Sequence, residues 1–445
     1  MERKKLTQIK SGAFSRGVSL ARLTVSAGAK VAAHSVGSLF ANEEEKATKF
    51  RALLLDQARA LTLELGQLKG SLMKAGQMLS LAGEHFLPPE VNAILKSLQS
   101  QSPPLDWPAI QKVLLKQLSP EKLTLIEINP SSFASASLGQ VHEATEKKTG
   151  RRFAIKIQYP GVDAAIDSDI ATLKKLLSVT KILARDRDLD PIFNEVREML
   201  HREVNYTLEL ESTLLFRQLL ANTPNVVIPE PVPEFCTNRI LTTTLEAGLC
   251  IDDPKVLSLP QERRNAIGKI YLELYLNEIF KFKRVQTDPH FGNYRIRLSP
   301  DSDQLVCYDF GAIKEIPDQF LKGYGTLLRG GLERDWNTLF EGADSLGIVL
   351  KEDNEEIKKT FRELSELLLE PFYADIYDWG ESDLPKRVVR KVADLAFHFK
   401  FRIPPKELVF LDRKMGGVFI FLSTLKCRIN AGDLLRTHLS SEYVS

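Results

Sequence analysis

Several features that would place a chain in a familiar class are missing from this sequence of 445 residues. Its four cysteines lie singly along the chain, at Cys236, Cys250, Cys307 and Cys427. This spacing indicates neither a zinc cluster nor a disulfide framework, and it favours a reducing compartment. No run of about 18 uncharged apolar residues occurs, which argues against a membrane-spanning helix of the ordinary kind. Internal repeats and low-complexity tracts are also missing.

A net charge of one sign is lacking over the chain as a whole. The sequence has 60 Lys and Arg residues against 58 Asp and Glu residues, so its formal net charge is +2. Because no chain-wide basic field exists, we expect no nucleic-acid partner. The proportions of hydrophobic residues, 43%, and charged residues, 27%, are typical of a globular protein and exclude disorder. The length is sufficient for two or more domains.

Charge is lopsided only at the N-terminus. Residues 1–42 carry seven Lys and Arg residues against Glu2 alone, a composition that is drawn to anionic lipid headgroups. Small residues recur three or four apart between Ala21 and Gly37, as at close helix contacts, so a partner helix or a homodimer is also expected here. Three alternatives are a helix docked on the rest of the protein, a frayed terminus and an organellar targeting segment. We predict a cytoplasmic protein with peripheral membrane association, or alternatively one on the matrix side of mitochondria.

Apolar periodicity predicts the helices and strands. Leucines between Leu61 and Leu79 follow helical spacings, and this long helix is expected to end before Pro88-Pro89. Short runs typical of strands cover residues 139–144, 152–158, 240–245 and 305–308. Helices are expected at residues 91–99, from about Pro191 to Leu220, and over most of the chain after Gln261. The chain is therefore expected to combine a small sheet with a largely helical region.

The clearest local pattern is Asp288-Pro-His-Phe-Gly-Asn293, followed by Asp309-Phe-Gly at the end of an apolar strand. A carboxylate, a later amide and a second carboxylate are the groups that phosphoryl transfer from MgATP requires. Asp288 would orient or deprotonate an acceptor, while Asn293 and Asp309 would supply oxygen ligands to Mg²⁺. His290 would either carry charge near the transferring phosphate or hold the loop.

Lys156 lies among apolar strand residues, where a buried ammonium group needs a partner. In kinases the partners are the ATP phosphates and a helix glutamate. At about 100° per residue, a single helix would place Asn205 and Glu209 on one face and Glu203 roughly 120° away, so that it addresses two neighbours. The alternatives are a lysine on an edge strand whose head reaches water, and a solvated acidic helix face.

A segment of small residues precedes the lysine strand, where protein kinases carry a glycine-rich loop that covers the phosphates. Only one of its residues, Gly139, is glycine, so the loop should be stiffer and nucleotide should sit differently beneath it. The residues expected to line the nucleotide are Ala134, Ser135, Ala136, Ser137, Gly139 and Gln140, together with Lys156. Taken alone, this segment reads as a turn of small residues.

With these residues in order, the chain resembles the UbiB-type family of atypical kinases, which includes mitochondrial relatives linked to coenzyme Q synthesis. The similarity runs from about residue 53 to at least residue 318. It rests on five ordered elements: Lys74-Ala-Gly-Gln77, matching the family's KxGQ motif; the alanine-rich loop; Lys156; Glu203 to Glu209; and Asp288 to Asn293 with Asp309. The resemblance implies an α+β, protein-kinase-like two-lobed fold with an added N-terminal helical extension that lies over the active site.

The resemblance also implies residue roles. Lys156 would contact the phosphates with Glu209 as its helix partner, Asp288 would be the catalytic-loop aspartate, and Asn293 and Asp309 would hold the metal ion. Lys74 and Gln77 would project into the pocket near Glu203 and restrict ordinary protein-kinase activity. This chain departs from the family pattern at Asn205, which replaces an aspartate, at Phe291, where relatives often have proline, and at Ser135, which interrupts the alanine run.

We therefore predict four regions: a basic, small-residue-rich segment (1–45), a helical extension carrying the KxGQ motif (46–130), a small lobe (131–244) and a large lobe (245–445). The predicted function is binding of ATP or ADP with Mg²⁺ and slow ATP hydrolysis, in support of ubiquinone synthesis or lipid homeostasis. The quinone link, with quinone-biosynthesis enzymes or lipid precursors as partners, comes from the resemblance alone. The alternatives are a phosphotransferase acting on a small molecule or lipid, and a pseudokinase scaffold that binds nucleotide.

Overall fold

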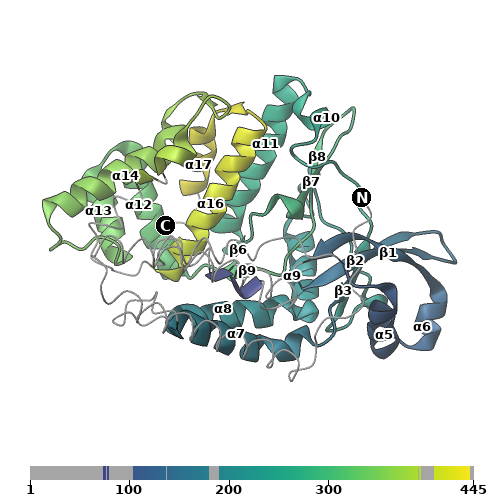
Figure 1. The fold of residues 1–445 in the computed structure, drawn as a ribbon. Helices are drawn as coiled ribbons and strands as arrows, with labels where there is room; N and C mark the ends of the chain where they lie inside the picture. Colours follow the sequence, from purple (N-terminus) through teal and green to yellow (C-terminus); the bar gives the residue numbers. More distant parts are fainter. Residues whose placement is uncertain are drawn as a thin grey trace, which may run out of the picture. The chain divides into compact units, whose positions relative to one another are not determined.

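The structure, a computed structural model, describes residues 74–76, 78–79, 104–136, 138–179, 190–388, 390–391 and 405–440 (Figure 1). The chain divides into two compact units, each considered by itself below. The first comprises residues 1–210 and 231–245, and the second comprises residues 211–230 and 246–445. The division after Leu245 lies beside the lobe boundary expected from the sequence, whereas residues 211–230 join the second unit. The basic N-terminal segment, most of the extension, Gln77 and Ser137 lie outside the described residues.

The first unit is built on a four-stranded antiparallel sheet with the order β1-β2-β3-β5. Its strands are β1 (Ile126–Ala136), β2 (Gly139–Glu146), β3 (Arg152–Gln158) and β5 (Ile240–Thr244). Residues alternate between the two faces, and Phe153, Ile155 and Ile157 of β3 point into the core. The three strands predicted for this region are confirmed.

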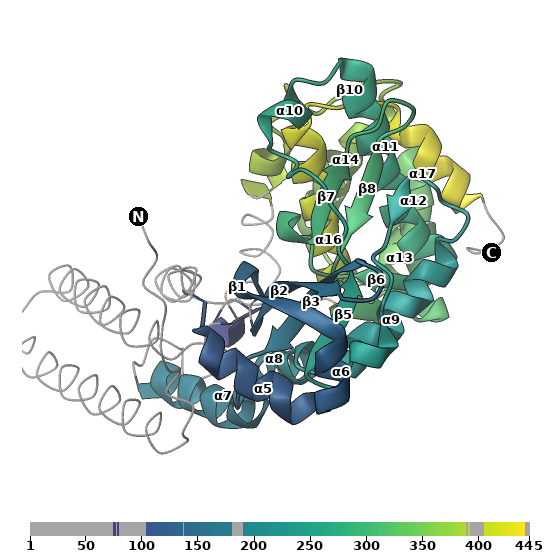
Figure 2. The same ribbon diagram turned by 90° about the vertical axis from the view of Figure 1, so that its right-hand side faces the viewer.

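Two helices precede the sheet, α5 (Trp107–Gln117) and α6 (Pro120–Leu125). The buried Ile110, Val113 and Leu114 of α5 belong to the same apolar cluster as Ile155 and Ile157, so α5 covers that face of the sheet (Figure 2). Ser119 caps α6 by accepting the backbone N–H of Lys122. A 3₁₀ turn, Pro233–Phe235, adds the buried ring of Phe235 to this core.

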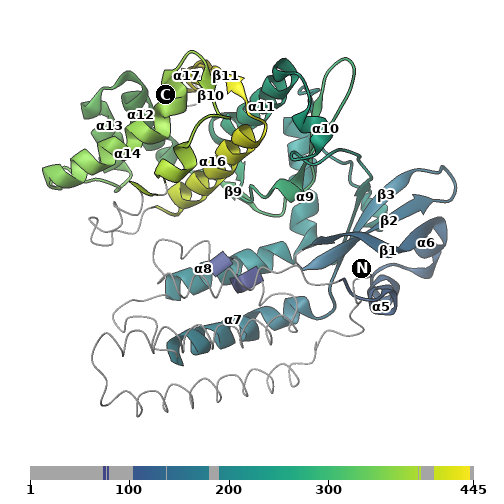
Figure 3. The same ribbon diagram turned by 45° about the horizontal axis from the view of Figure 1, so that its top comes forward.

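Three longer helices follow β3: α7 (Val162–Val179), α8 (Asp190–Glu203) and α9 (Tyr206–Leu219). Helices α7 and α8 lie side by side (Figure 3). The prediction of one continuous helix through Glu203 and Glu209 is wrong, because the helix breaks at Val204–Asn205. The Oδ1 atom of Asn205 accepts the backbone N–H groups of Thr207 and Leu208, at 3.2 and 3.4 Å. Asparagine is favoured at the N-cap position, so Asn205 begins a new helix, α9.

The second unit is mainly helical, as expected after Gln261. Its helices are α10 (Pro254–Leu257), α11 (Gln261–Leu276) with a π-helical turn (Asn277–Lys281), α12 (Asp318–Glu333), α13 (Trp336–Ser345), α14 (Glu355–Tyr373), α16 (Lys406–Thr424) and α17 (Ala431–Leu439). Its core lies around α11, where the fully buried Tyr271 and Leu272 meet Phe421 and Leu422 of α16. Within the described residues, no helix is both long and apolar enough to cross a membrane.

Short strands hold the loops of the second unit. β4 (Val226–Val227), β8 (Gln304–Cys307) and β7 (Tyr294–Arg297) form a three-stranded sheet; β6 (Arg284–Gln286) pairs with β9 (Ile313–Glu315), and β10 (Tyr377–Asp378) pairs with β11 (Arg428–Ile429). The segment predicted as a loop connects β6 to β7 and ends in a 3₁₀ turn, Phe291–Asn293. The strand predicted at residues 305–308 is β8, and the predicted α+β class is confirmed.

Candidate functional site

In the first unit, Lys156 and Glu209 form the ion pair that the family resemblance implies. The Nζ atom of Lys156 donates to both carboxylate oxygens of Glu209, at 2.7 and 2.8 Å. The Glu209 side chain is only 3% exposed and the Lys156 side chain 18% exposed. The alternative of a lysine on an edge strand does not apply, because β3 lies between β2 and β5. The ammonium group also lies 5.0 Å from the ring centroid of Tyr206, where a cation–π attraction supports it.

The alanine-rich loop is the tip of the β1–β2 hairpin. Ala134, Ser135 and Ala136 end β1, and Ala136 pairs directly with Gly139 of β2, which leaves a two-residue connection. A Cβ atom at position 139 would overlap the carbonyl oxygen of Ile157 on the neighbouring strand. The glycine is therefore required by the close approach of β3.

The side chain of Gln140 is turned away from Lys156. In the antiparallel register Val141 lies opposite Lys156, so the side chains of Gln140 and His142 occupy the other face of the sheet. Gln140 is buried there; its Oε1 accepts the backbone N–H of Leu105 at 2.9 Å, and its Nε2 lies 2.9 Å from Nε2 of His142. Strand alternation thus separates the side chain of Gln140 from that of Lys156.

His142 completes this buried polar chain. Its Nδ1 lies 2.7 Å from the carbonyl oxygen of Asn129, to which it can only donate. The remaining ring nitrogen, Nε2, must then accept from the amide of Gln140, which fixes a neutral imidazole. Burial lowers the pKa of His142, in agreement with this neutral state. The pair ties the alanine-rich hairpin to Leu105, and the sequence carried no motif that would have revealed it.

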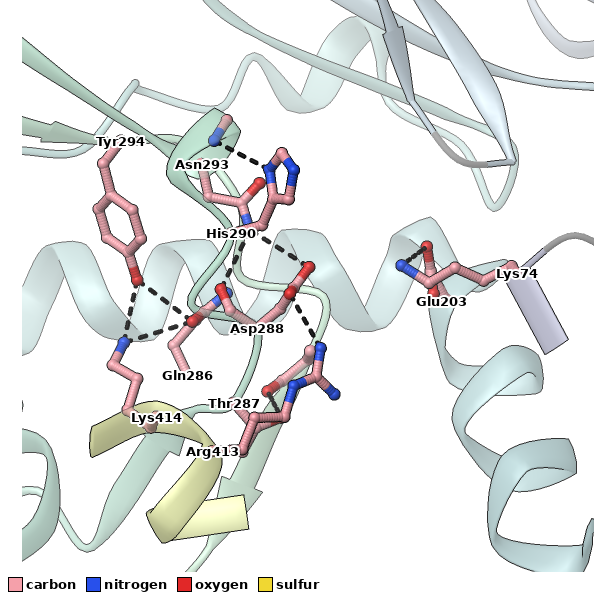
Figure 4. A network of polar contacts seen from close by, with 12 residues as sticks. Lys74, Glu203, Gln286, Thr287, Asp288, His290, Asn293, Tyr294, Arg413 and Lys414 are labelled. Atoms are coloured by element: carbon pink, nitrogen blue, oxygen red, sulfur yellow. Dashed lines mark hydrogen bonds and ion pairs between the residues drawn. The ribbon is translucent and has the colours of Figure 1, made fainter. Parts of the chain in front are cut away.

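Lys74 contacts Glu203, as the resemblance implies. The two side chains lie 3.1 Å apart, and both are largely buried (Figure 4). Lys74 begins a short described stretch of helix in which Ala75 and Leu79 belong to the core of the first unit. Glu203 is the last residue of α8, while Asn205 caps α9. The helix break therefore places Glu203 on α8 and Glu209 on α9, and each pairs with a different lysine.

In the second unit, the β6–β7 loop brings Asp288 and Asn293 together. The Nδ2 atom of Asn293 donates to the carbonyl oxygen of Asp288 at 3.2 Å and approaches its Oδ2 at 3.4 Å. The imidazole of His290 accepts the backbone N–H of Gly292 at 2.9 Å, which favours the loop-holding role of the two roles left open (Figure 4). The loop thus holds a carboxylate and an amide beside each other.

Asp309 lies just beyond the end of β8, next to this loop. Tyr294 pairs with Cys307 in the antiparallel register, and the backbone N–H of Tyr308 donates to the carbonyl oxygen of Asn293 at 3.0 Å. Asn293 therefore lies across from the residue that precedes Asp309. The Oδ1 atom of Asp309 accepts the backbone N–H of Gly311 at 2.8 Å, which orients the carboxylate. The two predicted metal ligands thus sit at adjoining strand ends.

Helix α16 supplies partners that the sequence analysis missed. Arg413 donates through Nη2 to Oδ1 of Asp288 at 3.2 Å, from 125 residues further along the chain. Gly417, one turn later, lies so close to Pro289 that a Cβ atom there would overlap the proline ring. The only local signal was a pair of cations, Arg413 and Lys414, within an apolar helical stretch that also contains two glycines.

The strand-borne lysine–glutamate pair of the first unit, and the Asp–Asn loop followed by a strand-end aspartate in the second, are the features of a protein-kinase-like fold. The model of the ABC1 atypical kinase-like domain matches residues 97–343, which is more than half of the chain. The chain therefore belongs to the ABC1 (UbiB-type) family of atypical kinases, and the resemblance expected from the sequence is confirmed.

The similarity to individual relatives extends beyond residues 97–343. The chain is 30% identical over 443 residues to "Atypical kinase COQ8B, mitochondrial" of Danio rerio, with 97% of this chain and 69% of that protein covered. It is 29% identical over 396 residues to "Atypical kinase COQ8, mitochondrial" of Saccharomyces cerevisiae, with 87% and 77% covered. The solved structure of Rv3197 of Mycobacterium tuberculosis with erythromycin is similar in fold, with a TM-score of 0.62, 24% identity, and 91% of this chain and 100% of that chain covered.

Proposed function

We propose that the protein binds ATP or ADP together with Mg²⁺ and hydrolyses ATP slowly, in support of isoprenoid quinone synthesis or lipid homeostasis. The observation that carries the proposal is the ion pair between Lys156 and Glu209. A lysine in the middle of a sheet is held by a buried carboxylate, which fixes the direction of its ammonium group. Such a fixed cation can stabilise the negative charge of phosphate groups.

Asn293 and Asp309 would hold the magnesium ion. Both offer hard oxygen atoms, and Mg²⁺ is commonly bound by one or two carboxylates together with substrate phosphates and water. Within the described residues, no group of three or more His, Cys, Asp and Glu side chains could hold a metal ion by itself. When bound, Mg²⁺ would neutralise charge on the phosphates.

Asp288 would orient the attacking oxygen. Its carboxylate is held by Arg413 and Asn293, so its direction is set before substrate arrives. If the attacking oxygen belongs to water, the outcome is hydrolysis, whereas a hydroxyl of a small molecule or lipid would give transfer. The Lys74–Glu203 contact supports hydrolysis, because the resemblance assigns to Lys74 a role in restricting transfer to protein substrates.

The cellular role is proposed from relatives and from charge. The named relatives are mitochondrial COQ8 kinases, and this supports a role in ubiquinone synthesis together with its enzymes or lipid precursors. The basic segment of residues 1–42 supports association with an anionic membrane surface. We place the protein at the surface of such a membrane, either on the cytoplasmic side or on the matrix side of mitochondria.

Thermal stability with and without nucleotide tests the core of this proposal. A ligand at 100 times its dissociation constant stabilises the folded state by about 2.7 kcal/mol. We expect ATP or ADP to raise the Tm of the wild-type protein only when Mg²⁺ is present, and Asp309→Asn to abolish this rise. The matched control is Asp318→Asn, the same change at an exposed aspartate of the second unit, which should keep the full shift.

Two outcomes would contradict the proposal. One is the absence of any Mg²⁺-dependent shift in the wild-type protein at millimolar nucleotide. The other is an equal shift in wild type and Asp309→Asn, which would place the metal elsewhere. If the shift is present, labelled ATP decides the reaction: free phosphate without a labelled product supports hydrolysis, and stoichiometric labelling of an added acceptor supports the phosphotransferase. Nucleotide binding without turnover would support the alternative of a pseudokinase scaffold.

A further inference from the structure

Lys414 connects the two ends of the loop that carries Asp288. This lysine of α16 is completely buried, and its Nζ atom donates to Oη of Tyr294 at 2.9 Å and approaches Oε1 of Gln286 at 3.4 Å. The hydroxyl of Tyr294 also donates to Oε1 of Gln286 at 3.2 Å, which closes a triangle of polar contacts (Figure 4). Gln286 is the last residue of β6 and Tyr294 is the first residue of β7. A single ammonium group therefore joins the residues that flank the loop on both sides.

Glu278 completes the arrangement from the π-helical turn after α11. Its carboxylate is 2% exposed and lies 3.4 Å from the ammonium group of Lys414. The same oxygen, Oε2, accepts the backbone N–H of Gln286 at 3.2 Å. The carboxylate thus neutralises the lysine and fixes the main chain at the start of the loop. The rings of Tyr271 and Tyr294 also lie within 6 Å of the ammonium group, at 5.7 and 5.5 Å.

Stability alone does not account for such a cluster. Removing two charges from water is so unfavourable that apolar side chains of similar volume often stabilise a core equally well or better. An ion pair with several hydrogen bonds restricts the relative orientation of its partners, because each contact is satisfied in one geometry only. Here the satisfied geometry fixes Gln286 two residues before Asp288 and Tyr294 directly after Asn293.

We propose that Lys414 is a positioning residue: by joining Gln286 and Tyr294, it sets the separation and direction of Asp288 and Asn293. Two neighbouring contacts of α16 also restrict the position of the loop: Arg413 donates to Asp288, and Gly417 lies against Pro289. The catalytic consequence rests on the proposed function, whereas the effect on the shape of the loop does not.

Two variants separate positioning from simple stabilisation. Lys414→Met removes the ammonium group and leaves the buried carboxylate of Glu278 unpaired, so the Tm should fall. Adding Glu278→Gln removes that unpaired charge but keeps an oxygen that can accept the N–H of Gln286. The double variant should therefore regain most of the Tm while the connection between Gln286 and Tyr294 through the ammonium group stays broken.

Backbone hydrogen exchange over residues 287–294 is the first measurement, because it needs no nucleotide. We expect exchange in this segment to be at least about tenfold faster than wild type in both variants, including the double variant with its restored Tm. The kcat for ATP hydrolysis should fall at least about tenfold, with KM for nucleotide little changed, because orientation rather than binding is lost.

Two control variants calibrate these results. Lys406→Met makes the same change on the same helix, at a side chain that is 77% exposed, and should leave Tm, exchange and kcat unchanged. Arg263→Met breaks the ion pair with the buried Asp303 elsewhere in the second unit, and should lower the Tm without faster exchange at residues 287–294.

The double variant decides the question. Wild-type exchange and kcat in that variant, together with a restored Tm, would overturn the proposal and reduce Lys414 to a stabilising residue. Equally fast exchange of the loop in Arg263→Met would also overturn it, because loss of stability would then be the cause. If the wild-type protein hydrolyses no ATP, the proposed function fails, and the exchange measurements still decide whether Lys414 positions the loop.

Discussion

Arg413 and Asp288 lie 3.2 Å apart between Nη2 and Oδ1, although 125 residues of chain separate them. Both side chains are about three-quarters buried, so water screens their interaction only in part. The guanidinium group restricts the direction of a carboxylate that stands beside Asn293. The orientation of the candidate catalytic aspartate is therefore fixed by a helix distant in sequence, and the consequences can be measured.

Removing the charge of Arg413 should reduce turnover more than binding. Arg413→Gln keeps a donor but loses the ion pair, and we expect the kcat for ATP hydrolysis to fall about tenfold with little change in KM for nucleotide. Steady-state phosphate release measures both. Arg436→Gln on α17, which alters an exposed pair with Asp433, is the matched control and should behave as wild type. An unchanged kcat in Arg413→Gln would exclude the orienting role.

Breaking the buried pair in the first unit should destabilise the fold. Lys156→Met leaves the carboxylate of Glu209 buried without its cation, which should lower the free energy of unfolding by about 3 kcal/mol. Lys283→Met removes a lysine from an exposed pair with Asp318 and should cost less than about 1 kcal/mol. Urea denaturation compares the two. Similar losses in both variants would mean that burial of the Glu209 pair has no energetic consequence.

A side chain at position 139 should disturb the hairpin. In Gly139→Ala the new methyl group overlaps the carbonyl oxygen of Ile157, so β2 and β3 must shift apart at a cost of about 1–3 kcal/mol. Gly416→Ala on α16 meets no neighbouring atom and should be neutral or stabilising by up to about 1 kcal/mol. Chemical denaturation of both variants, followed by nucleotide titration, checks this. Wild-type stability of Gly139→Ala would contradict the close approach.

Acid should weaken the fold through His142. Burial lowers the pKa of this histidine from its ordinary value of 6.5, so below about pH 6.5 the unfolded chain binds a proton that the folded protein excludes. Stability should therefore be lost as the pH falls through this range, and it should be fully present above it. Proton uptake would also turn the two hydrogen-bonded nitrogens of His142 and Gln140 into opposing donors.

Thermal melting between about pH 5 and pH 8 measures this effect. His142→Gln should lower the Tm at neutral pH, because a buried hydrogen-bonded ring is lost, but its Tm should fall less steeply in acid than that of wild type. His438→Gln, a partly buried histidine in the second unit, is the control. Parallel curves for wild type and His142→Gln would show that another group governs the acid response.

Deleting residues 1–42 should weaken attachment to anionic membranes. This segment carries seven positive charges against one negative charge, and attraction to acidic lipids is screened by salt. Co-sedimentation with vesicles containing phosphatidylserine should therefore decrease on deletion, and the binding of the full chain should decrease with added salt. Equal co-sedimentation of the two proteins at low salt would contradict this role.

Local patterns in the sequence predicted much of the first unit. Alternating apolar residues located β2, β3 and β5, and the lysine among the apolar residues of β3 indicated that its ammonium group needs a partner. The helix break was not predicted, because the apolar spacing continues through Val204–Asn205 and the capping preference of Asn205 was overlooked. The orientation of Gln140 was not predicted for a different reason. The residue was assigned to a loop, whereas in strand β2 its side chain follows the alternation between the two faces of the sheet.

In the second unit, the sequence indicated the candidate site residues but not the residues of α16 that hold their loop in place. Asp288, Asn293 and Asp309 were predicted as site residues because their types and spacing are typical of phosphoryl transfer. Arg413 and Lys414 could not be found in this way, since their partners are more than 100 residues away and only tertiary packing brings α16 to the loop. A cation within an apolar helix was the available signal, and it indicates a buried partner without saying which.

The contacts of α16 with the loop can form only late in the synthesis of the chain. Ribosomes add about 5–20 residues per second, so about 6–25 s pass between the emergence of Asp288 and that of Arg413. During this interval the nascent chain already carries Asp288, Asn293 and Asp309, but the contacts that Arg413 and Lys414 make with the loop have not yet formed. A chain that stops prematurely, even after the whole matched domain of residues 97–343, lacks these contacts. Under the proposed function, we expect such a chain to turn over ATP more slowly than a chain that includes α16.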